Sequence, residues 1–352
     1  MRTHLYSQEL AETQREVCLG MLRVAVVGCG WAGEWHAVAI SRHQGAELCA
    51  VVDEEESKAK TLSAKHQVPW FASLSDLLKS SVQVDAVSIC TMPASHVRLS
   101  VECIEAGKHV FCEKPLCRDR RETTDLVDAL KESDVRFGVN YNQRHSPLVR
   151  ELAQKMQSEG GAHVLHAEMH QQGPVSQSER INDYFLLTDS CCHIIDTLVF
   201  LNGPIQQVFA MGARLDRSIL SDVTANIRFS NGSLGSFEHS FVGARAGQHP
   251  FHLLDVTTAK ARHVLHDLYD GLHTYPHDEM QATHSRLSVF SQRSYGDSMV
   301  RSVHSWLDRL GDDEPAETGL AASMHNLDVV AACIESIESG NVVDIANSTH
   351  TL

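Results

Sequence analysis

The chain has 352 residues, of which 43% are hydrophobic and 21% are charged, as in an ordinary globular protein of about two domains. Acidic residues outnumber basic ones by 45 to 30, and the resulting formal net charge of −15 argues against nucleic acid as a partner. No apolar run is long enough to cross a bilayer, so we expect no membrane partner.

Residues 1–20 are predicted to be an N-terminal extension. Charged side chains such as Arg2, Glu9 and Arg15 are spread through it, so it lacks the apolar core of a secretory signal. The ten cysteines are scattered, without a C-x-x-C pair. Both observations favour reduced thiols and a cytoplasmic location.

Residues 21–145 alternate between predicted strands and helices. Strands are expected at 22–27, 47–52, 85–90, 109–112 and 135–139. Helices are expected up to about residue 42 and at about 55–66, 96–106 and 119–132, with Ser73 capping a short helix and Gly107 ending the third long one. Such alternation predicts an α/β fold with a doubly wound parallel sheet, covered by helices on both faces.

Residues 146–345 have a different pattern, which predicts an α+β domain. A helix at 147–156 is followed by extended runs at about 162–171, 206–214, 222–230, 233–242, 251–257 and 261–268. Asn231 and Gly232 separate two of these runs as a hairpin turn does, so the large sheet should be mostly antiparallel. Helices are expected at about 296–310 and 318–339, and the last of them can pack back on the first domain.

A glycine-rich turn follows the first predicted strand. Gly28, Gly30 and Gly33 fit G-x-G-x-x-G between a strand and a helix, a pattern that lets the backbone approach a pyrophosphate. Asp53 ends the second strand at nearly the spacing expected of a ribose-binding acid. Acidic residues follow it at 54–56 with no adjacent Arg, which favours NAD over NADP. The alternative is a glycine-rich turn that binds no ligand.

Lys114 follows the strand at 109–112, between Glu113 and Pro115. Doubly wound sheets bind ligands at the carboxyl ends of their strands, so this lysine is a candidate site residue. The alternative is a surface lysine at a strand end.

Asp189, His193 and Asp196 have the spacing i, i+4 and i+7, which places them on one face of a helix that ends at Gly203. An imidazole beside a carboxylate is suited to proton transfer near neutral pH. The alternative is a half-exposed polar helix face.

Together these segments resemble the Gfo/Idh/MocA oxidoreductases over about residues 22–345. The similar segments are Val26-Val27-Gly28-Cys29-Gly30, Gly107-Lys108-His109-Val110, Glu113-Lys114-Pro115, Asn140-Tyr141-Asn142-Gln143-Arg144 leading to Pro147, Asp189…His193…Asp196, and Glu317-Thr318-Gly319-Leu320. The resemblance implies an NAD-binding Rossmann domain and a C-terminal domain for substrate binding and oligomerisation, whose large open sheet often joins subunits. A homo-oligomer, dimer or tetramer, is therefore expected.

The resemblance also implies roles for single residues. Lys114 would contact the reacting oxygen, His193 would be the general acid and base, and Asp189 would hold the substrate or the histidine. The expected cofactor-binding residues are Gly28, Gly30, Trp31, Ala32, Gly33, Asp53, Thr91, Pro93, His96, Glu113 and Lys114. The expected substrate-binding residues are Lys114, Asn142, Arg144, Asp189 and His193. Helix packing is the alternative for Pro93 and His96, and a surface salt bridge is the alternative for Arg144.

The sequence therefore predicts an NAD-dependent oxidoreductase that moves a hydride between nicotinamide and a secondary alcohol or ketone of a sugar or polyol. A non-catalytic NAD-binding sensor, an NAD-dependent glycosidase and a carbonyl or imine reductase remain as alternatives. Residues 181–185 replace a glycine cluster of many family members, so no substrate is carried over. Cys191 and Cys192 are read as buried thiols. No metal site is expected, because His163 does not share a strand face with His166 and His170.

Overall fold

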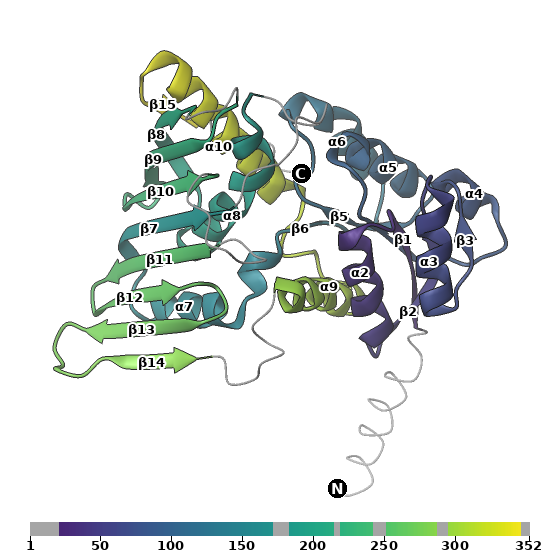
Figure 1. Ribbon diagram of the computed structural model, residues 1–352, viewed down its shortest axis with the longest axis horizontal. Helices are drawn as coiled ribbons and strands as arrows, with labels where there is room; N and C mark the ends of the chain where they lie inside the picture. The colour runs from purple at the N-terminus through teal and green to yellow at the C-terminus, as the bar shows by residue number, and fades with distance from the viewer. Residues whose placement is uncertain (1–20, 172–182, 215–218, 242–250, 287–294, 346–352) are drawn as a thin grey trace, which may run out of the picture.

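The computed structural model describes residues 21–171, 183–214, 219–241, 251–286 and 295–345, and it contains two sheets (Figure 1). The first has six parallel strands in the order β3-β2-β1-β4-β5-β6, which is the strand order of a Rossmann fold. Its strands are β1 Leu22–Val27, β2 Ala46–Val52, β3 Trp70–Phe71, β4 Ala86–Ile89, β5 His109–Glu113 and β6 Phe137–Asn140. The predicted doubly wound parallel sheet is confirmed.

Helices connect these strands close to the predicted positions. They are α2 Trp31–Arg42, α3 Glu56–His66, α4 Leu74–Lys79, α5 Pro93–Glu105 and α6 Thr124–Lys131. Ser73 caps α4 by accepting a hydrogen bond from the backbone N–H of Asp76, as predicted. Helix α5 begins earlier than predicted because Pro93 fits the first turn of a helix, where its missing N–H costs nothing.

The second sheet has nine strands in the order β14-β13-β12-β11-β7-β10-β9-β8-β15. They are β7 Ala162–His170, β8 Ile205–Ala213, β9 Asp222–Phe229, β10 Leu234–Ser240, β11 Phe251–Thr258, β12 Ala261–His266, β13 Gly271–Pro276, β14 Thr283–Arg286 and β15 Val343–Asp344. Every described neighbour pair is antiparallel except β7 with β10, so the predicted mostly antiparallel sheet is confirmed. Gly232 has a φ of +89° in the predicted hairpin turn between β9 and β10.

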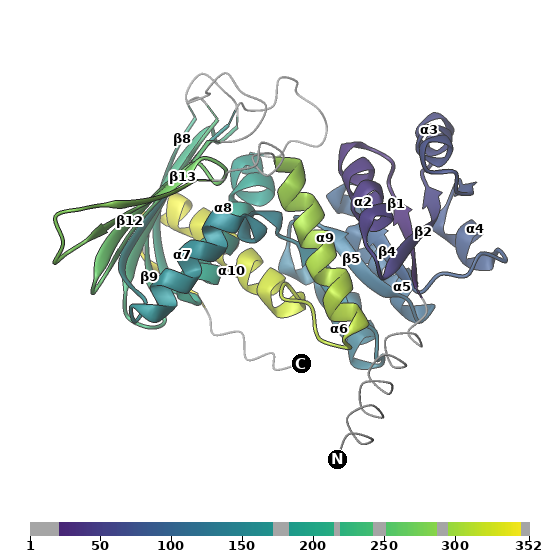
Figure 2. The ribbon, with the colours of Figure 1, turned by 90° about the horizontal axis from the view of Figure 1, so that it is seen from below.

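Three helices lie on one face of the nine-stranded sheet, the face toward the first domain (Figure 2). They are α7 Pro147–Ser158, α8 Cys191–Asn202 and α10 Leu320–Ser339. Helix α10 joins the two halves of the molecule. Leu320, Met324 and Leu327 pack into the core of the parallel sheet, whereas Val330 and Cys333 belong to the core of the large sheet.

Helix α9 Tyr295–Gly311 packs against α2 on the other face of the parallel sheet. Val303, Trp306 and Leu307 are buried there, and the Trp306 ring stacks on Phe111 with the ring centroids 5.0 Å apart. A helix from the C-terminal half of the chain therefore completes the cover of the Rossmann sheet. It also brings Tyr295 beside the glycine-rich turn.

Among the described residues, no helix is both long enough and apolar enough to cross a bilayer.

Candidate active site

A pocket of about 210 Å³ lies where the carboxyl end of the parallel sheet meets the start of α8. It brings together all three predicted catalytic residues, Lys114, Asp189 and His193. The residues that line it are Trp31, Lys114, Gln171, Asp189, Ser190, His193 and Tyr295. Segments more than 250 residues apart in the sequence therefore form a single polar site.

Lys114 enters the pocket from the end of β5, and its peptide bond to Pro115 is cis. Its Nζ donates to the backbone carbonyl of Asp189 over 3.2 Å and lies 3.8 Å from the Asp189 carboxylate. Burial favours the neutral amine, but the negative charge of Asp189 outweighs it and raises the pKa of Lys114 above its usual range. Lys114 is therefore a cation at any physiological pH.

Asp189 and His193 share the pocket, but the helix that carries them is not regular. Residues 186–190 form a π-helical turn, and α8 begins only at Cys191. Asp196, three residues after His193 in α8, does not line the pocket but forms a buried ion pair with Arg144, whose Nε donates to it over 2.9 Å.

His193 is buried and contacts Tyr295, whose hydroxyl lies 3.2 Å from Nε2 of the imidazole. Nδ1 is enclosed and has no hydrogen-bond partner among the described residues. Burial, reinforced by the positive charge of Lys114, lowers the pKa of His193 well below its usual value. His193 is therefore a neutral imidazole at physiological pH, beside a permanent cation.

Tyr295 holds a central position in the site. Its ring packs against Trp31 with the ring centroids 5.8 Å apart, and its hydroxyl also lies 3.2 Å from Oδ1 of Asn142. Burial raises the pKa of Tyr295 to about 12, so its hydroxyl stays protonated. Asn142 thus stands behind Tyr295 rather than on the pocket wall.

Glu113 points away from the pocket into a buried polar network. Its carboxylate meets His36 Nε2 at 3.0 Å, accepts from Asn140 Nδ2 at 2.7 Å and accepts from the backbone N–H of Lys114 at 3.2 Å. Burial opposes its ionisation, but the hydrogen bond to His36 outweighs it and lowers the pKa of Glu113. The network fixes the backbone from which Lys114 projects.

The glycine-rich turn has the shape that a dinucleotide requires. Gly28 has a φ of +96°, and a Cβ there would lie 2.6 Å from the backbone of Cys90. A Cβ on Gly33 would collide with the carbonyl oxygen of Gly28, whereas a Cβ on Gly30 would meet nothing within 4 Å. The first and third glycines are thus needed for packing, and the second leaves open space for a pyrophosphate at the start of α2.

The other predicted cofactor residues surround this turn. Asp53 accepts from the backbone N–H of Cys29 over 2.7 Å and from that of Glu55 over 2.8 Å, so it also fixes the turn itself. Each carboxylate oxygen keeps a second lone pair for a ribose hydroxyl. Trp31 is exposed and Ala32 half-buried on the first turn of α2.

Thr91 lies in the turn between β4 and α5, and Pro93 and His96 lie at the start of α5. The ring of His96 is fully buried, with Nδ1 2.9 Å from the carbonyl oxygen of Pro115 and Nε2 3.0 Å from that of Thr91. His96 thus ties the start of α5 to the Lys114 turn.

The structure places Arg144 outside the residues that line the pocket. Its guanidinium is buried against Asp196 and lies over the Phe200 ring, 5.0 Å from the ring centroid. Cys192 is buried beneath Asp189, and burial raises its pKa to about 12, as expected of an unreactive thiol.

Sequence reasoning missed four members of the site: His36, Gln171, Ser190 and Tyr295. Ser190 directly follows Asp189 and could have been included for that reason. His36, Gln171 and Tyr295 lie in segments whose sequence shows nothing unusual, and only the tertiary fold brings them together.

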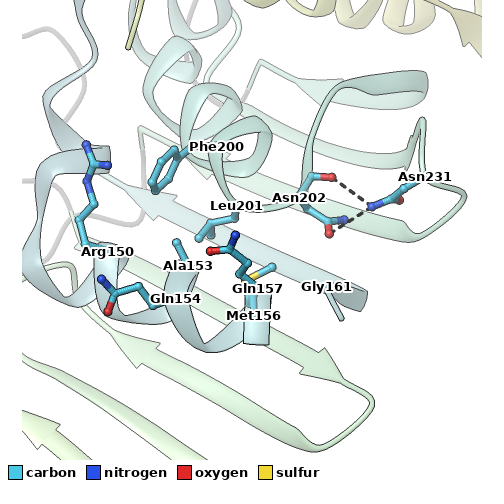
Figure 3. A pocket seen from close by; sticks show the side chains of 10 residues that line it. All are labelled: Arg150, Ala153, Gln154, Met156, Gln157, Gly161, Phe200, Leu201, Asn202 and Asn231. Carbon is cyan, nitrogen blue, oxygen red and sulfur yellow. Dashed lines mark hydrogen bonds between the residues drawn. The ribbon is translucent and has the colours of Figure 1, made fainter. Parts of the chain in front are cut away.

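A second pocket, of about 510 Å³, lies between α7 and the end of α8, next to the β9–β10 hairpin (Figure 3). Amide side chains such as Gln154, Gln157 and Asn202 line much of it. Among the described residues that line it, Arg150 is the one titratable side chain, and it is already bonded to Glu317. These residues offer no proton acceptor beside a cation, so the pocket at Lys114 is the better candidate for chemistry.

In the described part of the chain, no three His, Cys, Asp or Glu side chains converge in a way that could hold a metal ion.

Two family models match the chain. One, described as an oxidoreductase family with an NAD-binding Rossmann fold, matches residues 22–141, and the other, the GFO/IDH/MocA C-terminal domain, matches residues 151–256. The predicted NAD-binding Rossmann domain is thereby confirmed.

Single proteins resemble the chain more distantly. The uncharacterized oxidoreductase YrbE of Bacillus subtilis is 25% identical over 61% of this chain and 66% of its own length. Myo-inositol 2-dehydrogenase of Thermotoga maritima is 25% identical over 84% of this chain and 90% of its own. The crystal structure of a probable dehydrogenase from Thermotoga maritima superposes with a TM-score of 0.79 at 25% identity, covering 92% of this chain and 99% of that one.

Proposed function

The chain belongs to the Gfo/Idh/MocA family of oxidoreductases, and from this premise we propose that it is an NAD-dependent dehydrogenase of a sugar or polyol. The reaction moves a hydride between a secondary alcohol carbon of the substrate and nicotinamide. The name of the Thermotoga maritima relative, myo-inositol 2-dehydrogenase, supports a polyhydroxylated substrate.

One observation carries the proposal: a protonated, positively charged group and an unprotonated, neutral base face the same pocket. Lys114 is held as a cation and His193 as a neutral base, and the charge of the first helps to lower the pKa of the second. Titratable groups whose environments push their pKa values apart are typical of acid–base catalysis. A site that only sensed NAD would need neither group.

The chemistry can be assigned to residues. Bound NAD⁺ supplies the hydride acceptor. Backbone N–H groups at the start of α2 hold the pyrophosphate, and Asp53 accepts from the ribose hydroxyls. Lys114 donates to the substrate oxygen and stabilises the negative charge that develops there. His193, which is neutral, accepts the hydroxyl proton.

Asp189 has a supporting role in this scheme. Its backbone carbonyl and its carboxylate both hold the ammonium of Lys114, so it orients the lysine and balances its charge. In the reverse direction, protonated His193 returns its proton to the oxygen of the ketone.

The test is NADH formation from NAD⁺, followed by absorbance, across a panel of polyols, sugars, amino sugars and sugar phosphates. We expect a signal with wild type and a loss of at least about 100-fold in kcat for Lys114→Ala and for His193→Ala, because each removes a group that acts in the transition state. NADH binding, followed by its fluorescence, should be retained in both.

His163→Ala and Lys155→Ala, which change residues outside the pocket, should leave kcat unchanged. Full turnover in both site variants would refute the assignment of Lys114 and His193. Release of an aglycone from glycosides without net NADH would instead identify an NAD-dependent glycosidase.

We also propose that the protein is a cytoplasmic homo-oligomer, a dimer or tetramer. Val164 and Leu234 support this, because these apolar neighbours are exposed on the face of the large sheet opposite α7, α8 and α10. The nine cysteines among the described residues are all free thiols, as suits a reducing compartment.

A further inference from the structure

We infer that Gln171, locked by Ser190 and His239, presents a hydrogen-bond acceptor to the substrate, and that the pocket therefore selects a neutral polyol or sugar over its carboxylate or phosphate analogue. The inference rests on the proposed function, because it concerns the substrate of the same pocket.

The chain of hydrogen bonds begins at a backbone carbonyl. Nδ1 of His239, on β10, lies 2.8 Å from the carbonyl oxygen of Met169, and a carbonyl oxygen can only accept. Nδ1 must therefore carry a proton. Burial lowers the pKa of His239 to about 3, so the ring is neutral and its other nitrogen, Nε2, is an acceptor.

Ser190 comes next in the chain. Its buried hydroxyl lies 2.7 Å from Nε2 of His239 and has a single proton, which it must donate to that nitrogen. The oxygen of Ser190 is then free only to accept. It accepts from the side-chain amide of Gln171, over 2.7 Å.

The direction of this chain fixes the orientation of the Gln171 amide. The nitrogen must face Ser190, and the oxygen, Oε1, is left with no hydrogen-bond partner among the described residues. Gln171 and Ser190 both line the pocket that contains Lys114. A substrate group next to Oε1 must therefore donate, as a hydroxyl does and as a carboxylate or phosphate oxygen does not.

The charges of the pocket point the same way. Among its described lining residues, the one cation, Lys114, lies 3.8 Å from the one carboxylate, that of Asp189. His193 and Tyr295 are neutral at physiological pH. No unbalanced cation remains among these described residues to compensate an anionic substrate, so at this group of side chains an anion would lose hydration without gaining a partner.

The test compares matched pairs of probes: D-glucose with D-glucuronate, and D-galactose with D-galacturonate. Their affinity for the complex of the protein with NADH is measured by calorimetry, which does not depend on turnover. With wild type we expect the neutral sugar of at least one pair to bind about tenfold or more tightly than its acid, the size of effect typical of an unmet hydrogen bond.

Ser190→Ala is the decisive variant. It frees the Gln171 amide to turn and offer its N–H groups, so the ratio of the two affinities should fall toward one. A purely structural defect would weaken both probes equally and leave the ratio unchanged. Gln171→Met is the second variant: it should weaken the neutral sugar about tenfold and leave the acid unaffected. Ser236→Ala removes a similar Ser–His pair, with His166, from the opposite face of β10 and should change nothing.

Equal binding of acid and neutral sugar by wild type, binding of neither member of either pair, or an unchanged ratio in Ser190→Ala overturns the inference. The same pairs are then assayed for NADH formation. Selective binding without turnover would reject the dehydrogenase and keep the inference, whereas turnover without selectivity would do the opposite.

Discussion

Lys114 and His193 line the same pocket, but their different charged neighbours give the two side chains different protonation states. Both side chains are largely enclosed, and burial alone would favour the neutral form of each. Of the two, only Lys114 has a carboxylate partner among the described residues, at Asp189, and so only Lys114 keeps its charge. His193 has the opposite surroundings, because its charged neighbour is a cation. Lys114 is therefore suited to stabilise negative charge, and His193 is suited to accept a proton.

Replacing Lys114 with Met should change the titration of His193. Loss of the cation removes one of the causes that lower the pKa of His193, so that pKa should rise. His193 accepts a proton only when neutral, so the acid limb of any residual oxidation activity should move to higher pH. Histidine NMR titration of wild type and Lys114→Met measures the shift directly. Lys155→Met is the control, and an unmoved His193 in Lys114→Met would contradict the electrostatic account.

At the level of elements, the glycines of the turn between β1 and α2 have different structural roles. A Cβ on Gly33 would collide with the Gly28 carbonyl, whereas the space around Gly30 is open. Gly33→Ala should therefore push α2 away from β1 and lower the free energy of unfolding by about 1–3 kcal/mol, as overpacked sites do.

Gly30→Ala should leave the unfolding free energy nearly unchanged but weaken NADH binding at least about tenfold, because the added methyl occupies the place of a pyrophosphate. Urea unfolding without cofactor and a fluorescence titration with NADH separate the two effects. If Gly30→Ala bound NADH like wild type, the assignment of the pyrophosphate to this turn would be wrong.

The strand–helix alternation of residues 21–145 was enough to predict the parallel sheet, because each segment there has a clear period and a short connection. The spacing of Asp189, His193 and Asp196 could not reveal their separate partners. Asp196 lies three residues after His193 in α8, but its carboxylate pairs with Arg144, which comes from a distant segment. The strands β3, β13, β14 and β15 were not anticipated; β3 and β15 have two residues each and β14 has four, which is too few for a clear alternation. Gln171 and Tyr295 could not be found because contacts between distant segments leave no local signal.

At the level of the whole molecule, the two sheets are joined by helices that cross from one to the other. Helix α10 has residues in both cores, and α9 covers one face of the parallel sheet. The contact of Tyr295 with Trp31 and with His193 depends on the position of α9. The geometry of the pocket is thus a property of the complete chain.

Trp306→Ala tests this dependence. Trp306 is 3% exposed and stacked on Phe111, so its removal should lower the free energy of unfolding by about 3–5 kcal/mol, measured in urea. NADH affinity should fall as well, although Trp306 lies outside the pocket, because α9 supports Tyr295 beside Trp31. A variant that unfolds at a lower urea concentration but binds NADH as tightly as wild type would show that α9 stabilises the sheet without shaping the site.

The position of α9 also affects how the chain folds while it is being synthesised. A ribosome releases residues 21–145 long before residues 295–311, yet Val24, Ile40 and Phe111 are buried partly by that last segment. Until it emerges, the nascent Rossmann sheet has one apolar face that its own helices do not fully cover. The newly made chain should therefore depend on chaperones in this interval, and its N-terminal half should reach its final form only when synthesis is nearly finished.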